Sequence, residues 1–318
     1  MASFSLRYLA VVHLVFIFVS GVCCVRFRIT NNCGYTVWPG VLAGAGGESL
    51  STSGFVLGQG ESRTLEMPAL WSGRLWGRTH CFTDGSTGKF SCATGDCGSG
   101  HLECSGSGAS PPATLAEFTL GGSGDMDFFD VSLVDGYNLP MLVTPEASSA
   151  SVGNCRATGC AVDLNGLCPS DLRVELLSQS GGEGQSVACR SACEAFGRPE
   201  FCCSGAYGNP NTCKPSSYSQ LFKNACPRAY SYAYDDATST FTCATGTSYA
   251  ITFCPTTTSQ KAGEKTPAAA VPLINDTMVF LGAVSEQSDA TLLLPTGRQA
   301  VAAAVAVAWL TLHDWINF

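Results

Sequence analysis

The chain has 318 residues, of which 45% are hydrophobic and only 13% charged, so its composition excludes a chain that stays unfolded for lack of apolar residues. Its 17 Lys and Arg residues against 25 Asp and Glu residues give a net charge of -8, with no basic stripe. This balance argues against nucleic acid as a partner.

The N-terminus has the pattern of a secretory signal peptide. Arg7 supplies a positive charge, an apolar run over 9–19 follows, and small residues close the segment. We expect cleavage after Cys24, so that residues 1–24 are a signal peptide and the mature chain is secreted. A retained membrane anchor is the alternative, but the apolar run is short for a bilayer span.

Short segments of alternating or β-branched residues then recur between glycine-rich turns. They predict strands over 25–30, 35–38, 74–79, 116–120, 128–134, 238–243 and 249–254. Many short strands separated by turns are typical of a β-sandwich or a β-barrel. The fold class is therefore expected to be mainly β.

The cysteines favour disulfides over metal. Of 18 cysteines, 16 lie beyond the expected cleavage site, an even number in a secreted chain. Zinc is the alternative for the cysteine-rich stretch 88–104, but the spacings are irregular and the expected mature domain holds only His80 and His101. We expect a disulfide framework with no metal. Spacing alone leaves the pairing open.

Two helical patterns interrupt the later half. A helix is predicted over 186–197, with Cys189 and Cys193 one turn apart on one face. A second helix is predicted over 217–226, because the proline that follows cannot continue it. The density of cysteines around both helices predicts a disulfide-rich, partly helical lobe over about residues 154–230.

The composition changes after residue 255. Residues 256–290 are rich in Thr, Ser, Ala and Pro and predict a stalk, in which Asn275 begins the one N-x-S/T sequon of the chain. Residues 291–318 contain an apolar run that, with small residues upstream, matches the signal for a C-terminal glycolipid anchor. An unanchored secreted protein with a loose tail is the alternative.

Several stretches resemble the thaumatin-like, or pathogenesis-related group 5, proteins of plants. They include "NNCGYTVWPG" from Asn31, "GKFSCATGDC" from Gly88, "DFFDVSLVDGYNLPM" from Asp127 and "ACRSACEAFG" from Ala188. The resemblance covers residues 25–255, which we take as one thaumatin-like domain. It implies a flattened antiparallel β-sandwich core, a disulfide-rich, partly helical second domain and a small third lobe.

The resemblance also implies how the cysteines pair. The eight implied disulfides are Cys33–Cys254, Cys81–Cys92, Cys97–Cys104, Cys155–Cys243, Cys160–Cys226, Cys168–Cys189, Cys193–Cys202 and Cys203–Cys213. The first of these would tie the start of the domain to its end.

In this family, function is attributed to an acidic cleft between the first two domains, lined in many members by one arginine and four acids. By motif position, the residues of this chain that would bind substrate are Arg74, Glu117, Asp130, Asp135 and Asp235.

Two of these positions stay open, because Arg78 shares the strand face of Arg74 and Asp236 directly follows Asp235. The place of a third residue, Asp135, in the cleft requires a turn of the chain. Asp130 and Asp135 would point to opposite faces of a regular strand, so they share a cleft only if the chain turns at the Asp-Gly pair beginning with Asp135.

Such a cleft has two chemical uses. Carboxyl groups that lie close together raise one another's pKa values, and a nearby arginine lowers them. A protonated carboxyl group beside an ionised one is the apparatus of glycoside hydrolysis, for which Glu117 and Asp130 are the catalytic candidates. The same set of carboxyl groups can form hydrogen bonds with sugar hydroxyls without cleaving the sugar chain.

The resemblance implies a secreted antifungal defence protein that binds β-1,3-glucan of fungal or plant cell walls. A weak endo-β-1,3-glucanase is the first alternative, and a structural or signalling cell-surface protein without glucan activity is the second. We expect a monomer, with no cofactor, in the apoplast or anchored to the outer face of the plasma membrane.

Three readings from other classes are disfavoured. A serine hydrolase would need a positioned histidine, and neither His80 nor His101 lies in a nucleophile-elbow context. A sweet-taste role is linked in the family to basic surfaces, unlike this acidic chain. Membrane permeabilisation would need an amphipathic helix that the sequence does not identify.

Overall fold

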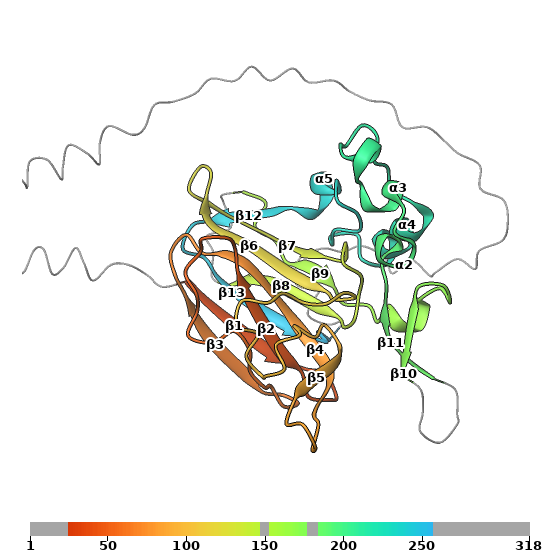
Figure 1. Cartoon of the computed structure of the whole chain (residues 1–318). Coiled ribbons are helices and arrows are strands. Elements are labelled where there is room, and N and C mark those ends of the chain that lie inside the picture. Colours follow the sequence, from red (N-terminus) through yellow and green to blue (C-terminus); the bar gives the residue numbers. More distant parts are fainter. Residues whose placement is uncertain (1–24, 147–152, 177–183, 257–318) are drawn as a thin grey trace, which may run out of the picture. The chain divides into compact units, whose positions relative to one another are not determined.

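The computed structural model describes residues 25–146, 153–176 and 184–256, which form a β-sandwich with helices beside it (Figure 1). All of them belong to the first of two units into which the chain divides, Met1–Lys265. Several predictions fall outside the described residues: the signal peptide over 1–24, the stalk after residue 256, the sequon at Asn275 and the apolar tail over 291–318.

One layer of the sandwich is a five-stranded sheet with the order β3-β1-β13-β8-β9. Its strands are β1 (Val25–Asn31), β3 (Ser62–Met67), β8 (Met141–Glu146), β9 (Thr158–Cys160) and β13 (Ser248–Phe253). All pairs are antiparallel except β1 with β13, which run parallel with Phe27 opposite Tyr249. The last described strand therefore lies inside the sheet, beside the first.

The other layer has six strands, with the order β12-β7-β6-β4-β2 and β5 paired to β4. They are β2 (Trp38–Ala43), β4 (Ser72–Thr83), β5 (Phe90–Thr94), β6 (Leu115–Gly122), β7 (Met126–Ser132) and β12 (Phe241–Ala244). Every pair in this layer is antiparallel.

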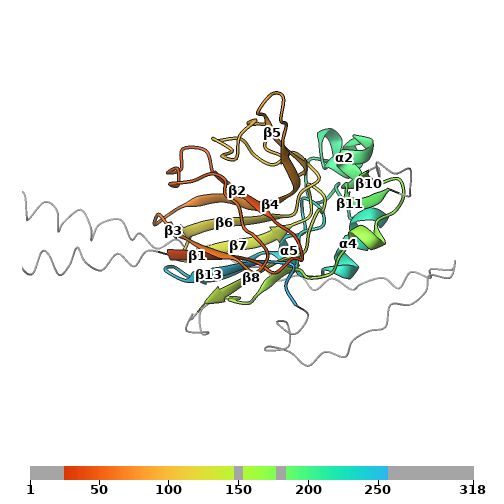
Figure 2. The same ribbon diagram turned by 90° about the horizontal axis from the view of Figure 1, so that it is seen from below.

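Figure 2 shows the strands of the two layers from below. Apolar side chains fill the space between the layers. In β1 the residues at 25, 27 and 29 are buried and those at 26 and 28 are exposed. The rings of Phe27 and Phe118 lie 4.3 Å apart, and those of Phe129 and Tyr249 lie 5.0 Å apart. The predicted sandwich is confirmed, and the parallel pairing of β1 with β13 departs from a purely antiparallel core.

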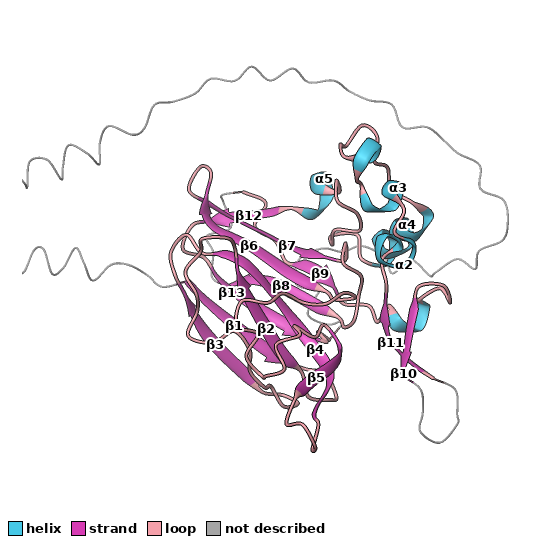
Figure 3. Ribbon diagram, in the orientation of Figure 1, coloured by secondary structure: helices cyan, strands magenta, loops and turns pink. Residues whose placement is uncertain are grey.

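The remaining elements are short, and most of them gather on one side of the sandwich (Figure 3). They are η1 (Asn165–Leu167), β10 (Arg173–Leu176), β11 (Gln185–Cys189), α2 (Ala192–Phe196), α3 (Pro199–Cys202), η2 (Gly205–Tyr207), α4 (Ser217–Ala225) and α5 (Asp236–Ser239). No helix in the described part of the chain is long and apolar enough to cross a membrane.

The helix predicted over 186–197 is wrong in its first half. Residues up to Cys189 form β11, which pairs with β10, and the helix begins only after the N-cap Ser191. It ends at Gly197, as predicted, with a left-handed φ of 63°. Cys189 exchanges two backbone hydrogen bonds of 2.8 Å with Tyr137, so contacts distant in sequence override the local helical pattern.

The second predicted helix is confirmed as α4. Its N-terminus has a capping box in which Ser216 and Ser219 satisfy each other's backbone amides, and Phe222 anchors it in the core. Two predicted strands begin earlier in the chain than the strands of the structure do. Of residues 35–38 only Trp38 lies in β2, and the first residues of 238–243 belong to α5, so that β12 begins at Phe241.

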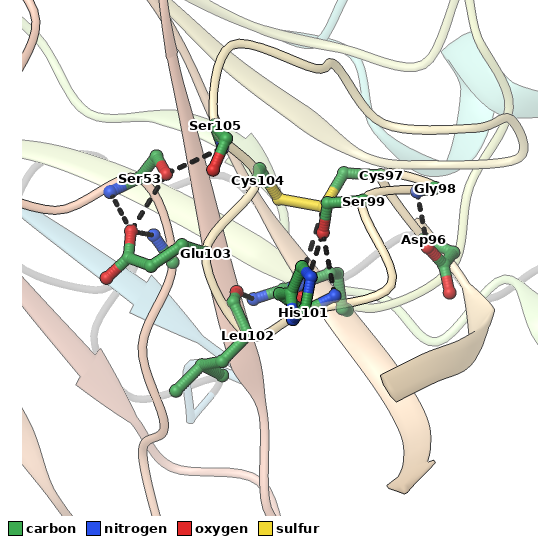
Figure 4. Close-up of a disulfide and its surroundings, with 12 residues drawn as sticks. Ser53, Asp96, Cys97, Gly98, Ser99, His101, Leu102, Glu103, Cys104 and Ser105 are labelled. Carbon is green, nitrogen blue, oxygen red and sulfur yellow. Dashed lines mark hydrogen bonds between the residues drawn. A yellow bond between two sulfur atoms is a disulfide. The ribbon is translucent and has the colours of Figure 1, made fainter. Parts of the chain in front are cut away.

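Eight disulfides cross-link the described residues, and they are the same eight pairs that the resemblance implies. Figure 4 shows Cys97–Cys104. Beside it, the Glu103 carboxylate accepts hydrogen bonds from Thr52 Oγ1 (2.7 Å), from the amide and hydroxyl of Ser53 (2.5 and 2.8 Å) and from the Gly54 amide (2.9 Å). Burial alone would raise the pKa of Glu103, but these bonds outweigh it and hold that pKa below its ordinary value.

Candidate functional site

Three charged side chains form a row across the six-stranded sheet. Arg74 on β4 lies opposite Glu117 on β6, and Glu117 lies opposite Asp130 on β7. Residues directly opposite each other project from the same face of a sheet, so all three point away from the core. The Nε of Arg74 is 3.9 Å from Oε1 of Glu117.

Two adjoining cavities meet at this row. The first, of about 300 Å³, is lined by Arg74, Glu117 and Asp130 together with Phe128 and neighbouring residues of β2, β4 and β6. The second, of about 290 Å³, is lined by Glu117, Asp130, Asp135, Tyr230 and four further residues. Because Glu117 and Asp130 line both, the cavities form one continuous depression. We call it the acidic groove.

Asp135 reaches the groove through the turn that the sequence required. The Gly136 amide donates to the Leu133 carbonyl at 3.0 Å, which closes a turn directly after β7. Gly136 has a φ of 85°, and an added Cβ there would lie only 2.6 Å from Cβ of Pro112. Glycine is therefore needed at this position, and the turn brings Asp135 to the cavity that Asp130 lines.

Among these acids, Asp130 has the pKa that is shifted furthest from its ordinary value. Burial, the charge of Glu117 and the charge of Asp236 together raise the pKa of Asp130 to about 8. Its Oδ2 is buried and has no hydrogen-bond partner among the described residues. Near neutral pH, Asp130 is therefore a protonated carboxyl group that faces the groove as an unused hydrogen-bond donor or acceptor.

The influences on the pKa of Glu117 oppose one another. Burial raises the pKa of Glu117, Arg74 lowers it, and Asp135 raises it again. The glutamate side chain is 39% exposed, against 42% for the arginine, so their ion pair contributes little to stability. The groove therefore places an accessible carboxyl group next to a protonated one.

The structure separates Asp235 from the other predicted residues. Its carboxylate is held by Lys223 Nζ at 2.9 Å and by the amide and hydroxyl of Ser231 at 3.0 and 3.1 Å. Asp235 is not among the residues that line either cavity. The neighbouring Asp236 accepts the Tyr230 hydroxyl at 2.9 Å and acts on Asp130 by its charge.

Arg78, the alternative to Arg74, has a structural position. It is fully buried, and its guanidinium group donates to the carbonyls of Trp38 (2.9 Å), Pro39 (3.3 Å) and Leu102 (2.7 Å). These contacts hold its charged group against the loop that contains Leu102, and Arg78 is not among the residues that line the groove.

Besides the core residue Phe118, two aromatic residues line the groove, and neither was predicted. Phe128 could have been found, because it precedes Asp130 by two and so shares its face of β7. Tyr230 had no such signal. It reaches the groove because its backbone pairs with β7, through a bridge to Ser132.

Neither histidine of the domain lines the groove. His80 stacks on Tyr35 with ring centroids 6.3 Å apart, and His101 lies in the loop of Figure 4. Within residues 25–146, 153–176 and 184–256, no cluster of three or more His, Cys, Asp and Glu side chains has the arrangement of a metal site.

Replacing Asp130 by Asn should stabilise the protein, and more at pH 8 than at pH 4. An unfolded aspartate titrates near about 4, so the stability associated with the raised pKa of Asp130 is fully present below about 4 and is lost as the pH rises through about 8. Asparagine has nearly the same shape and never ionises. We expect the variant to gain at least about 1 kcal/mol over the parent at pH 8.

Urea unfolding at pH 4, 6 and 8 measures this difference. The control is Asp125→Asn, since Asp125 is exposed at the turn before β7. A stability difference between parent and Asp130→Asn that does not change with pH would show that Asp130 titrates normally.

The model of the Thaumatin family matches residues 31–255. A "Thaumatin-like protein 1" of Pyrus pyrifolia is 52% identical over 253 residues, which cover 79% of this chain and 100% of that protein. A protein of the same name from Arabidopsis thaliana is 58% identical over 232 residues, 71% of this chain and 85% of its own length. A "Glucan endo-1,3-beta-glucosidase" of Prunus avium is 53% identical over 225 residues, 71% of this chain and 88% of its own length.

Proposed function

Because this chain belongs to the thaumatin family, we propose that it is a secreted defence protein whose acidic groove binds β-1,3-glucan of cell walls. The groove residues in this proposal are Arg74, Glu117, Asp130 and Asp135. Asp235 is not among them, because its carboxylate is bound to Lys223 and Ser231.

The observation that carries the proposal is the free carboxyl group of Asp130. A buried polar oxygen without a partner is unfavourable, because burial removes its bonds to water and nothing replaces them. A sugar hydroxyl both donates and accepts, so it could satisfy Asp130 and Glu117 together. Arg74 adds donors on one side of this pair and Asp135 an acceptor on the other.

The shape of the groove suits a chain-like ligand. The two cavities continue each other across the strands instead of forming one closed pocket, and each is about 300 Å³. Phe128 borders one and Tyr230 the other, and aromatic faces can stack on sugar rings. The name of the Prunus avium relative supports β-1,3-glucan as the polymer.

A second function is favoured by one observation. A protonated Asp130 beside Glu117 is the acid and base arrangement that glycoside hydrolysis requires. Slow endo-β-1,3-glucanase activity is therefore the first alternative. The second is a structural or signalling cell-surface protein that neither binds nor cuts glucan.

The place of action stays a proposal. We propose that the signal peptide directs a monomer to the apoplast, where its C-terminal region carries a glycolipid anchor to the plasma membrane. Release of the protein from plant membranes by a phosphatidylinositol-specific phospholipase tests the anchor, and peptides from residues 313–318 in the mature protein would contradict it.

Incubation with insoluble β-1,3-glucan tests the proposed function. The purified protein is mixed with the polymer at pH 5, and the pellet is scored for bound protein and the supernatant for soluble sugar. Insoluble β-1,4-glucan serves as a control with the same sugar unit and a different linkage. We expect binding to the β-1,3-polymer with little or no sugar release. Equal recovery on both polymers, or on neither, would contradict glucan recognition.

A further inference from the structure

Tyr230 is held rigidly beside the groove by its own backbone. Its amide donates to the Val131 carbonyl at 2.9 Å, and its carbonyl accepts from the Leu133 amide at 2.8 Å. These two bonds add Tyr230 to the edge of β7 in a parallel bridge with Ser132. The side chain lines the same cavity as Asp130. The position of its hydroxyl group is therefore set by the sheet and not by a flexible loop.

The hydroxyl group of Tyr230 fixes a carboxylate. It donates to Oδ1 of Asp236 at 2.9 Å and also contacts the Thr240 hydroxyl. Burial is the largest of the causes that raise the pKa of Tyr230, so the hydroxyl keeps its proton. Asp236 is the first residue of α5, and the Thr240 amide bonds to its carbonyl at 3.2 Å. Both the backbone and the side chain of Asp236 are thus fixed.

The charges that face Asp130 are all of one sign. Glu117 approaches from β6, Asp236 approaches from α5, and Asp135 lies at the turn that follows β7. Tyr230 faces it as a neutral phenol. The nearest arginine of the row, Arg74, lies beyond Glu117 and forms its ion pair with that residue. Asp130 therefore faces carboxylates from two elements, and no cation pairs with it among the described residues.

We propose that Asp236, held in place by Tyr230 beside the cavity that Asp130 lines, is a positioning residue whose charge adds to burial and to Glu117 in favouring an O–H donor on Asp130. Asp236 acts on the groove through Asp130 and need not touch a ligand. The identity of the ligand as a glucan rests on the proposed function, but the proton on Asp130 does not.

The direct test follows the carboxyl carbon of Asp130 by nuclear magnetic resonance. Secreted protein labelled with 13C at aspartate is titrated from pH 4 to pH 10, and the Asp130 signal is identified by its loss in Asp130→Asn. We expect a midpoint of about 8 in the parent. In Asp236→Asn it should fall by about one pH unit or more, because a like charge at close range is removed. Tyr230→Phe, which removes only the hydroxyl, should lower it by less.

Asp125→Asn is the matched control, since it removes one aspartate charge at an exposed turn before β7 and should leave the midpoint unchanged. A midpoint in Asp236→Asn equal to that of the parent, with the fold intact by circular dichroism, would overturn the inference. An equal fall in the Asp125→Asn control would also overturn it, because the effect would then be one of net charge.

Glucan binding as a function of pH separates this inference from the proposed function. If the parent binds glucan, its binding should weaken near the Asp130 midpoint, and this weakening should move to lower pH in Asp236→Asn. If the midpoint falls by nuclear magnetic resonance but the parent binds no glucan, the positioning role of Asp236 holds and the proposed function fails. Binding whose pH dependence is the same in parent and Asp236→Asn would contradict the use of the Asp130 proton by the ligand.

Discussion

Replacing Cys33 and Cys254 together by alanine should lower the free energy of unfolding by about 5 kcal/mol, the largest effect expected of any single disulfide here. This bridge joins residues 221 apart, directly after the paired strands β1 and β13. A cross-link stabilises by restricting the unfolded chain, and the restriction grows with the loop that it closes. The Cys155–Cys243 disulfide shortens the loop that Cys33–Cys254 closes, because it joins residues 88 apart. The loop nevertheless contains more than roughly 100 residues.

The matched control is Cys203→Ala with Cys213→Ala, which opens a loop of only 10 residues. On the same entropic account it should cost about 3 kcal/mol. Both variants are unfolded by urea at equilibrium without reductant, and their free energies are compared with that of the parent. Equal losses in the two variants would show that chain entropy does not govern the stability of this protein.

Glu117→Gln and Asp130→Asn should separate binding from catalysis in the acidic groove. Hydrolysis needs a proton donor and a base in opposite protonation states, so losing one of them should abolish turnover. Binding distributes its free energy over several hydrogen bonds of about 0.5–1.5 kcal/mol each, so losing one should weaken affinity only several-fold. We expect both variants to fold and to bind β-1,3-glucan with several-fold lower affinity. Any sugar release by the parent should vanish in at least one of them.

Binding isotherms on insoluble β-1,3-glucan at pH 5, with soluble sugar measured in the same samples, provide both readouts. Glu66→Gln and Asp125→Asn are the controls, since they make the same chemical changes at exposed residues of β3 and of the turn before β7. Should both groove variants bind as tightly as the parent, the groove is not the glucan site. Binding would then have to be sought elsewhere on the surface.

The groove is built at the expense of stability. Its central side chain, Asp130, is a half-buried acid near Glu117 and Asp236, and its buried Oδ2 has no partner among the described residues. Natural sequences keep such unfavourable groups mainly where function requires them. Arg78 provides a contrast, because its buried charge is satisfied by three backbone carbonyls and serves the fold.

Local sequence was sufficient where the determining contacts are local. Alternating or β-branched residues between turns placed β1, β4, β6, β7 and β13, because such residues favour extended backbone whatever the partner strand. The capping serines and the following proline delimited α4 in the same way. The helix predicted from Ser186 failed because β10 and Tyr137 take up the backbone hydrogen bonds of that segment.

By itself, the sequence determined the mainly β class and the positions of several strands. It also determined that the cysteines form disulfides, and that the chain turns at Asp135 so that this residue can share a cleft with Asp130. Each of these depends on neighbours within a few residues or on composition. Only the tertiary structure decided that Arg74 and not Arg78 joins the row, that Asp235 is bound to Lys223, and that Tyr230 lines the cavity of Asp130 while its hydroxyl group binds Asp236. These outcomes depend on which strands pair and on contacts between separate segments of the chain, which no pattern within a few residues encodes.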